Sequence, residues 1–367
     1  MLILLPPHLV EGMDDASRKV TLEPEVDQAR PKSHVRPAPA DWKDGTLRVG
    51  VHVSIAGGVR QSLERAHALG CTALQIFSTS PRMWPARRGV YKWLTAAEAE
   101  RFRVRRAELA LGPLVVHDNY LINLASPDRA TRTRSIQALS EELARALWIG
   151  ADYLVLHPGN AGNAPLESAI AAIVEGLRRA TRGLSLGELH ILLENTAGQG
   201  SALGWRFEHL EAILRACPEL PLGVCLDTAH TFAAGYDLSS ETGLQRTLSE
   251  FAATIGFERL HVVHVNDSKA PAGSRVDRHE HIGRGKIGLE NFRRFLNHPW
   301  IRDWPGRAFI LETPVDRPGD DRRNLRTVWA LFGQALPVRA GARDGFPARR
   351  ISSAKRRTQK RAALRNT

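Results

Sequence analysis

Short apolar runs alternate with longer amphipathic segments from residue 47 to residue 334. The apolar runs have the length and the Val, Ile and Leu content of strands buried on both faces. The segments between them repeat apolar residues at helical spacing, and several end at a Gly. The predicted strands are residues 47–54, 71–78, 113–119, 152–160, 188–196, 220–230, 259–267 and 307–314. The predicted helices are residues 57–70, 95–110, 129–150, 164–183, 207–217, 239–256, 289–297 and 320–334.

Eight strand–helix repeats over about 290 residues indicate an α/β protein built as a single (β/α)8 barrel, the TIM barrel. A doubly wound open sheet is the alternative. It is disfavoured because no GxGxxG or P-loop sequence follows any predicted strand. Polar residues also stand at nearly every strand end. A barrel gathers these ends at one mouth, whereas an open sheet would spread them along an edge.

The polar residues at the strand ends are mostly His, Asp and Glu, the side chains that bind divalent metals. Six apolar runs end in such a residue, at His117, His157, Glu194, Asp227, His264 and Glu312. His230 follows Asp227 closely, and Asp277 and His279 lie in the polar loop after the seventh strand. One zinc ion takes three or four protein ligands, so nine residues suit two or three ions that share carboxylates. Such clusters are typical of phosphoryl transfer.

A His at a single strand end is more often structural than a metal ligand. We apply that interpretation to His209, His261 and His281, and leave open a supporting role for His52 beside the ligands. The nine residues together are a different case. Their convergence by accident would require unrelated polar residues to end six separate strands.

The composition is that of a globular protein, with 43% apolar and 25% charged residues. The three cysteines lack CxxC spacing, and we read no signal peptide or membrane span, so we expect a cytoplasmic protein. Residues 1–46 form a predicted disordered extension and residues 47–337 the barrel. Residues 338–367 hold ten Lys or Arg against one Asp, so nine of the twelve net positive charges lie there. This predicted disordered tail either adds phosphate contacts or has no role.

At these residues the chain resembles the endonuclease IV family of zinc-dependent apurinic/apyrimidinic endonucleases, also called AP endonuclease family 2. The resemblance spans about residues 47–333 and is most specific in HDNYLINL and GSRVDRHEHIG. The matching motifs are GVHVSIAGG (50–58), PRMW (81–84), HDNYLINLASP (117–127), HPGN (157–160), ENTAGQG (194–200), GVCLDTAHTFAAGYDL (223–238), HVNDSK (264–269), GSRVDRHEHIGRGKIG (273–288) and LETP (311–314).

The resemblance implies a xylose-isomerase-like barrel with three zinc ions per chain. One ion would be held by His117, His157 and Glu194, and the second by Glu194 with Asp227, His264 and Glu312. The third would be held by His230, Asp277 and His279. In such enzymes a metal-bridging hydroxide attacks the phosphate 5′ to an abasic site and leaves a 3′-hydroxyl and a 5′-deoxyribose phosphate. Glu194 and Glu312 are then the catalytic carboxylates around that hydroxide.

The implied partner is double-stranded DNA that contains abasic sites, in base excision repair, and we expect a monomer that does not bind membranes. The damaged nucleotide must leave the helix to reach a barrel mouth, and a side chain must fill the gap. Arg82, Trp84, Tyr120 and Leu121 are the candidates, because Arg and apolar wedges prop open a duplex. Ordinary packing is the alternative for Trp84. We also expect trimming of blocked 3′ ends.

Two other functions compete with this prediction. A metal-dependent sugar isomerase or epimerase of the same barrel superfamily also places Glu, Asp, His and Glu at strand ends five to eight. Such enzymes bind one or two ions and have no use for His117, His157, His230 and the Asp277–His279 pair together. A non-catalytic DNA-binding protein is the third class, and the intact set of ligand residues argues against it.

Overall fold

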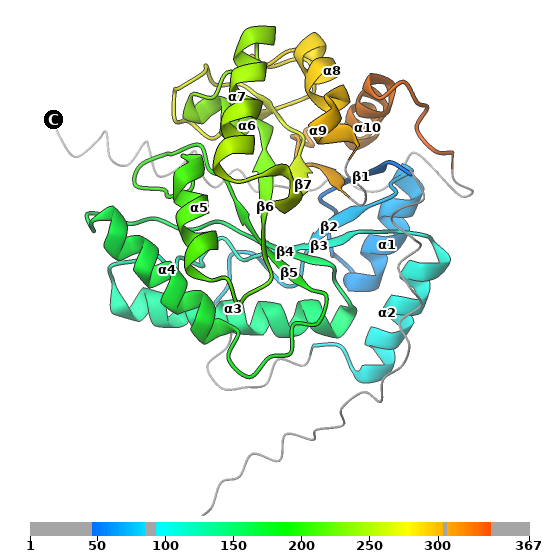
Figure 1. The fold of residues 1–367 in the computed structure, drawn as a ribbon. Helices are drawn as coiled ribbons and strands as arrows, with labels where there is room; N and C mark the ends of the chain where they lie inside the picture. Colours follow the sequence, from blue (N-terminus) through cyan, green and yellow to red (C-terminus); the bar gives the residue numbers. More distant parts are fainter. Residues whose placement is uncertain (1–45, 85–92, 304–306, 339–367) are drawn as a thin grey trace, which may run out of the picture. The chain divides into compact units, whose positions relative to one another are not determined.

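The computed structural model describes residues 46–84, 93–303 and 307–338. Apart from Thr46 and Val338, the predicted extension and basic tail lie outside these residues. In these residues the main sheet has eight parallel strands, and strands are drawn as arrows in Figure 1. They are β1 (Arg48–Val51), β2 (Leu74–Phe77), β3 (Leu114–His117), β4 (Tyr153–Leu156), β5 (His190–Glu194), β6 (Leu222–Asp227), β7 (Leu260–His264) and β10 (Ala308–Leu311).

The sheet curls into a barrel. The strands lie in the order β1-β10-β7-β6-β5-β4-β3-β2, and the two end strands meet at a parallel bridge between His52 and Gln75. Gly50 makes this contact possible, because a Cβ atom there would lie 1.9 Å from the carbonyl oxygen of Ala73. The predicted (β/α)8 barrel is confirmed.

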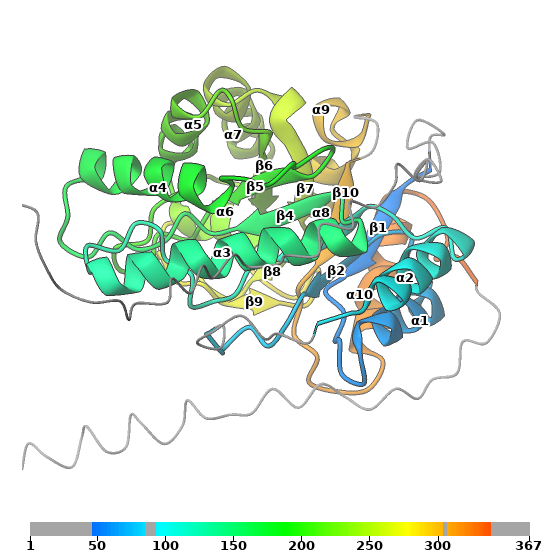
Figure 2. The same cartoon turned by 90° about the horizontal axis from the view of Figure 1, so that it is seen from below.

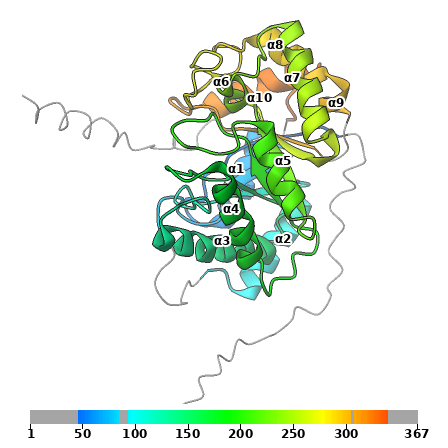
Figure 3. The same ribbon diagram turned by 60° about the vertical axis from the view of Figure 1, so that its left-hand side comes forward.

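Within the part of the chain that the structure describes, eight helices cover the outside of the strands, as predicted, and Figures 2 and 3 show α3 lying alongside α4. They are α1 (Val59–Leu69), α2 (Ala96–Glu108), α3 (Arg129–Ile149), α4 (Leu166–Ala180), α5 (Phe207–Ala216), α7 (Glu241–Thr254), α8 (Leu289–Asn297) and α10 (Asp320–Leu331). Among the described residues, none of the helices is long and apolar enough to cross a membrane.

Several short elements were not predicted. The sixth strand was expected to continue to residue 230, but it ends at Asp227 and the helix α6 (Thr228–Ala234) begins at once. The loop after β7 contains a two-stranded ribbon of β8 (Asp267–Ser268) and β9 (His279–Glu280). A 3-10 turn, η1 (Phe257–Arg259), precedes β7, and a short helix, α9 (Pro299–Arg302), follows α8.

Two apolar layers follow from the alternation of side chains along each strand. One face of every strand packs against the helices, where Phe102, Phe207, Phe251 and Phe292 are fully buried. The other face fills the inside of the barrel. That interior layer consists of Ala73, Val115, Val155, Leu192, Cys225, Val262, Ala308 and Ile310. A side chain two residues beyond the interior layer therefore points into the barrel mouth.

Candidate metal centre

Each of the six strand-end residues lies two positions after the interior-layer residue of its strand. His117 follows Val115, Glu194 follows Leu192, and the same relation holds for the other four strands that end in a ligand-type residue. Parallel strands bring these ends to the same side of the barrel. The alternation of side chains along the strands therefore converts six separate strand ends into one cluster.

His117, His157 and Glu194 form the first group of donors. Oε2 of Glu194 lies 3.2 Å from Nε2 of His117 and 3.0 Å from Nε2 of His157. Glu194 is fully buried, and His117 is 3% exposed. On its far side, Nδ1 of His117 faces Asp118, with 3.0 Å to the carbonyl oxygen and 3.3 Å to a carboxylate oxygen. Asp118 therefore orients the ring so that Nε2 faces the group.

Glu194, Asp227, His264 and Glu312 form the second group. All their donor atoms lie within 4.8 Å of one another. Nδ1 of His264 is 3.0 Å from Oε1 of Glu194, 3.6 Å from Oε2 of Glu312 and 3.9 Å from Oδ2 of Asp227. Glu194 belongs to both the first and the second group, because its two carboxylate oxygens face different histidines. The Cys225 thiol, in the interior layer, lies within 4.8 Å of the donor atoms of Glu194 and His264.

Asp227, His230 and His279 form the third group. Asp277 joins it, since Oδ1 of Asp277 lies 3.4 Å from Nε2 of His230 and 3.4 Å from Nε2 of His279. His279 Nε2 is also 3.6 Å from Oδ2 of Asp227. Asp227 is thus shared by the second and third groups. The structure brings together all nine residues that the sequence singled out.

The unpredicted helix α6 is what places His230. Asp227 is its N-cap, and Oδ1 accepts a hydrogen bond of 2.8 Å from the backbone N–H of His230. Asn195, at the end of the neighbouring strand, holds the same turn, because its carbonyl oxygen lies 2.9 Å from Nδ1 of His230. One carboxylate therefore caps a helix with one oxygen and leaves Oδ2 facing His264 and His279.

The loop that carries Asp277 and His279 is anchored by a buried carboxylate, Asp267. Its two oxygens accept hydrogen bonds of 2.8–3.0 Å from the backbone N–H groups of Ser268, Gly283, Gly285 and Ile287. Asp267 is 0% exposed. Four backbone donors around one carboxylate fix the turn that follows β9, and so fix the loop at the mouth.

The donor set fits divalent metal ions. Imidazole and carboxylate are the ligands that zinc and similar ions take. Nε2 of His279 is buried and, within the described residues, makes no hydrogen bond. Carboxylates and imidazoles also lie with their donor atoms within 4.8 Å of one another in each group. Bound cations would accept the lone pair of this nitrogen and compensate the negative charge of the neighbouring carboxylates.

Electrostatics couple the groups tightly. Burial alone would lower the pKa of His117, but Asp118 and Glu194 raise it well above 6.5. In the same way, Asp227 and Asp277 outweigh the burial of His230 and raise its pKa well above 6.5. Burial alone would raise the pKa of Glu194, but His264 and His157 hold it well below 4.5. A proton and a metal ion therefore compete for the same nitrogen of each imidazole.

The metal-free protein is expected to be most stable in mildly acidic solution. The raised pKa values of His117 and His230 contribute stability that is present below pH 6.5 and is lost as the pH rises through their folded-state values. The lowered pKa values of Glu194 and Glu312 contribute stability present above pH 4.5 and lost as the pH falls through theirs. Protein stripped with a chelator should therefore unfold at a lower temperature at pH 8.5 than at pH 5.5. A midpoint that rises over this interval would contradict the assignment.

The predicted DNA-binding residues occupy two loops at the mouth. Tyr120 is 58% exposed, and its ring lies 5.1 Å from Phe77 and 6.2 Å from His117. Arg82 is exposed and Leu121 half-buried. The two loops are joined by hydrogen bonds from the Tyr120 backbone N–H to the Pro81 carbonyl (3.1 Å) and from the Asn119 amide to the Met83 carbonyl (2.6 Å).

Trp84 differs from the other three candidates. It is partly buried and packs against the outer hydrophobic core. This contact favours the packing alternative for Trp84. Met83, which precedes it in the same loop, is 60% exposed.

Sequence reasoning gave no role to several polar residues behind the ligands. The available signal was that these residues stand next to predicted ligands in the sequence or lie within the same motifs. They are Asp118, Asn195, Asn266 and Asp267. Asn266 donates a 2.6 Å hydrogen bond from its amide to Oδ2 of Asp227 and accepts one of 2.8 Å from the backbone N–H of Glu312. Gln75 lies outside these motifs. The available signal for Gln75 was that it is a polar residue inside an apolar run.

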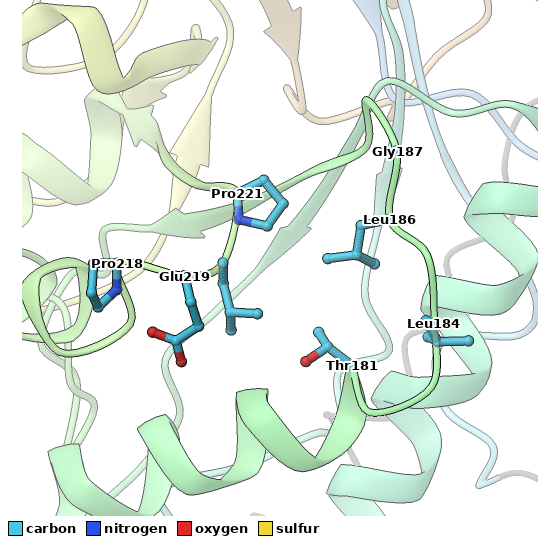
Figure 4. Close-up of a pocket in the computed structure, with 8 residues that line it drawn as sticks. Thr181, Leu184, Leu186, Gly187, Pro218, Glu219 and Pro221 are labelled. Atoms are coloured by element: carbon cyan, nitrogen blue, oxygen red, sulfur yellow. The ribbon is translucent and has the colours of Figure 1, made fainter.

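A cavity of about 520 Å³ lies away from this cluster (Figure 4). It is formed by the connections that lead into β5 and β6, so it sits at the opposite end of these strands from Glu194 and Asp227. Its lining residues are Thr181, Leu184, Leu186, Gly187, Pro218, Glu219, Leu220 and Pro221. The candidate metal centre is therefore not in this cavity.

Comparison with known proteins identifies the family. The family described as the xylose isomerase-like TIM barrel matches residues 63–330. A probable endonuclease 4 of Solibacter usitatus (strain Ellin6076) is 49% identical over 299 residues, which cover 80% of this chain and 100% of that protein. The chain belongs to the endonuclease IV family. A probable endonuclease 4 of Chloroflexus aurantiacus (strain ATCC 29366 / DSM 635 / J-10-fl) is 42% identical over 286 residues, covering 77% and 98% of the two chains.

Solved structures agree with membership of the endonuclease IV family. The crystal structure of endonuclease IV from Thermus thermophilus matches with a TM-score of 0.67 and 40% identity, covering 78% of this chain and 99% of that one. A D-tagatose 3-epimerase-like protein, at a TM-score of 0.58 and 17% identity, shares the fold alone. The family resemblance predicted from the motifs is confirmed. As a member of the endonuclease IV family the chain is an enzyme, a phosphodiester-hydrolysing endonuclease.

Proposed function

We propose that this endonuclease hydrolyses the phosphodiester 5′ to abasic sites in duplex DNA, leaving a 3′-hydroxyl and a 5′-deoxyribose phosphate. We also propose that it trims blocked 3′ ends. The observation that carries the proposal is the cluster at the barrel mouth, in which three groups of donors are linked through Glu194 and Asp227. Family membership supplies the substrate class, because the relatives are named as endonucleases.

We propose three zinc ions per chain. His117, His157 and Glu194 would hold the first, and Glu194, Asp227, His264 and Glu312 the second. His230, Asp277 and His279 would hold the third, with Asp227 beside them. When bound, such ions would activate water at neutral pH and neutralise charge on the phosphate and the leaving oxygen. Every one of the nine residues comes from a single chain, which supports action as a monomer.

The protein's own residues would orient and confine the substrate. Glu194 and Asp227 are 0% exposed, so their charges are poorly screened and fixed before DNA arrives. His157 is more open, with a side chain 36% exposed, and Asp277 is 48% exposed. These two residues therefore mark the side of the cluster that a phosphate would reach. Glu194 and Glu312 are the carboxylates that we place closest to the reacting atoms.

Extrusion of the abasic nucleotide would depend on the two joined loops at the mouth. Tyr120 is exposed next to His117, so a group that fills the gap in the duplex would stand beside the first donor group. Leu121 would add apolar contact and Arg82 a phosphate or base contact from the neighbouring loop. Trp84 would act by supporting that loop, since it packs against the core.

The test is a duplex that carries one tetrahydrofuran abasic analogue. This analogue cannot undergo β-elimination, so a nick on its 5′ side with a 3′-hydroxyl end must come from hydrolysis. We expect one such nick, lost after prolonged incubation with a strong chelator and restored by zinc. Undamaged duplex is the control and should remain intact. Absence of a nick, with metal analysis showing bound ions, would instead favour sugar substrates of the kind used by other barrels of this fold.

A further inference from the structure

A buried glutamine connects two of the candidate ligands. Gln75 is the second residue of β2 and is 0% exposed, inside an otherwise apolar strand. It follows Ala73 of the interior layer by two residues, so its side chain points toward the mouth. Its Nε2 lies 2.6 Å from Oε1 of Glu312, and its Oε1 lies 2.8 Å from Nε2 of His264.

The direction of these hydrogen bonds follows from which groups can donate a hydrogen and which can only accept one. An ionised Glu312 only accepts, so the amide nitrogen of Gln75 must face it and donate. The amide oxygen then faces His264 and can only accept. Nε2 of His264 must therefore carry a hydrogen, which leaves Nδ1 as the nitrogen with a lone pair for an ion.

The rest of the geometry agrees with this assignment. Nδ1 of His264 is the nitrogen that faces Glu194, Glu312 and Asp227, at 3.0, 3.6 and 3.9 Å. Oε1 of Glu312 is approached by Gln75 and also, at 3.2 Å, by Nδ1 of His52. Oε2 of Glu312 is thereby the oxygen directed to the second donor group. One amide orients two ligands from different strands.

We propose that Gln75 is a positioning residue of the metal centre, which fixes the tautomer of His264 and the orientation of Glu312. The inference rests on the metal centre of the proposed function. If Gln75 merely filled the barrel interior, an apolar side chain of the same length would replace it without consequence for metal binding. This distinction can be measured on the protein without DNA.

The experiment compares Gln75→Met, Gln75→Glu and Ile76→Val. Met keeps the length of the side chain and removes both hydrogen bonds, whereas Glu keeps an acceptor toward His264. Ile76 is the next residue in the strand and packs in the outer core, so Ile76→Val controls for a general loss of packing. Each metal-free protein is titrated with Zn²⁺ and Co²⁺ against a competing chelator, and thermal unfolding confirms that each is folded.

We expect Gln75→Met to weaken one class of metal site by about 10- to 100-fold, the usual effect of losing a group that orients a ligand. Ile76→Val should bind metal within about twofold of wild type. In zinc-loaded protein labelled with ¹⁵N-histidine, the Nε2–H of His264 should exchange slowly in wild type and Gln75→Glu, and rapidly in Gln75→Met.

Wild-type metal affinity in Gln75→Met, or a loss no larger than in Ile76→Val, would overturn the proposal. If Gln75→Met does not fold, loss of the protected His264 N–H in the isosteric Gln75→Glu overturns it instead. Neither readout involves DNA. A failure of the abasic-site assay would therefore reject the proposed substrate while the role of Gln75 is decided separately.

Discussion

Glu312→Gln is expected to lower the rate of cleavage at an abasic site by roughly 10³-fold or more, while the protein still binds the damaged duplex. Gln has the shape of Glu but no negative charge, and its amide nitrogen is not a metal ligand. Glu312 faces His264 at 3.6 Å, and its pKa lies well below 4.5, because the neighbouring His264 and His52 outweigh its burial. The ionised form is therefore the one present at neutral pH.

The measurement is single-turnover cleavage of the tetrahydrofuran duplex, with binding followed separately by fluorescence anisotropy. Glu219→Gln is the matched control, because Glu219 pairs with Arg178 and lies by the cavity at the other end of the strands. It should cleave at the wild-type rate. Cleavage by Glu312→Gln within about tenfold of wild type would reject the assignment of Glu312 to the metal centre.

Asp267→Ala is expected to lower the free energy of unfolding by about 3 kcal/mol and to reduce cleavage by about 100-fold. The substitution leaves four backbone N–H groups without their acceptor in a buried place. Water can satisfy them only if the turn opens. Opening the turn would displace Asp277 and His279, which belong to the same loop, and weaken the third group of donors.

Urea unfolding and zinc titration together test this expectation. The stability loss should be larger when zinc is bound than in chelated protein, because the loop contributes ligands only to the loaded form. Asp303→Ala, a substitution of an acidic residue that follows α9, provides the control and should change neither quantity appreciably. Wild-type zinc binding in a destabilised Asp267→Ala would show that the turn supports the fold but not the metal centre.

The sequence by itself determined the barrel and the set of candidate ligands. Both depend on local patterns. His117, Glu194 and Asp227 each end an apolar run typical of a buried strand, and the parallel strands of a barrel bring such ends to one mouth. For that reason these three residues could be assigned to one cluster before their neighbours were known. Asp277 and His279, two residues apart in the polar loop after β7, joined the same set of candidates.

Only the tertiary structure decided how the ligands are oriented, because orientation depends on partners that are distant in the chain. Gln75 and Glu312 are 237 positions apart, and no local pattern indicates that one amide serves both Glu312 and His264. The helix α6 was missed for a related reason. The sixth apolar run ends at Asp227, and the helix begins there because the Asp227 carboxylate caps it and Asn195, from the neighbouring strand, holds His230.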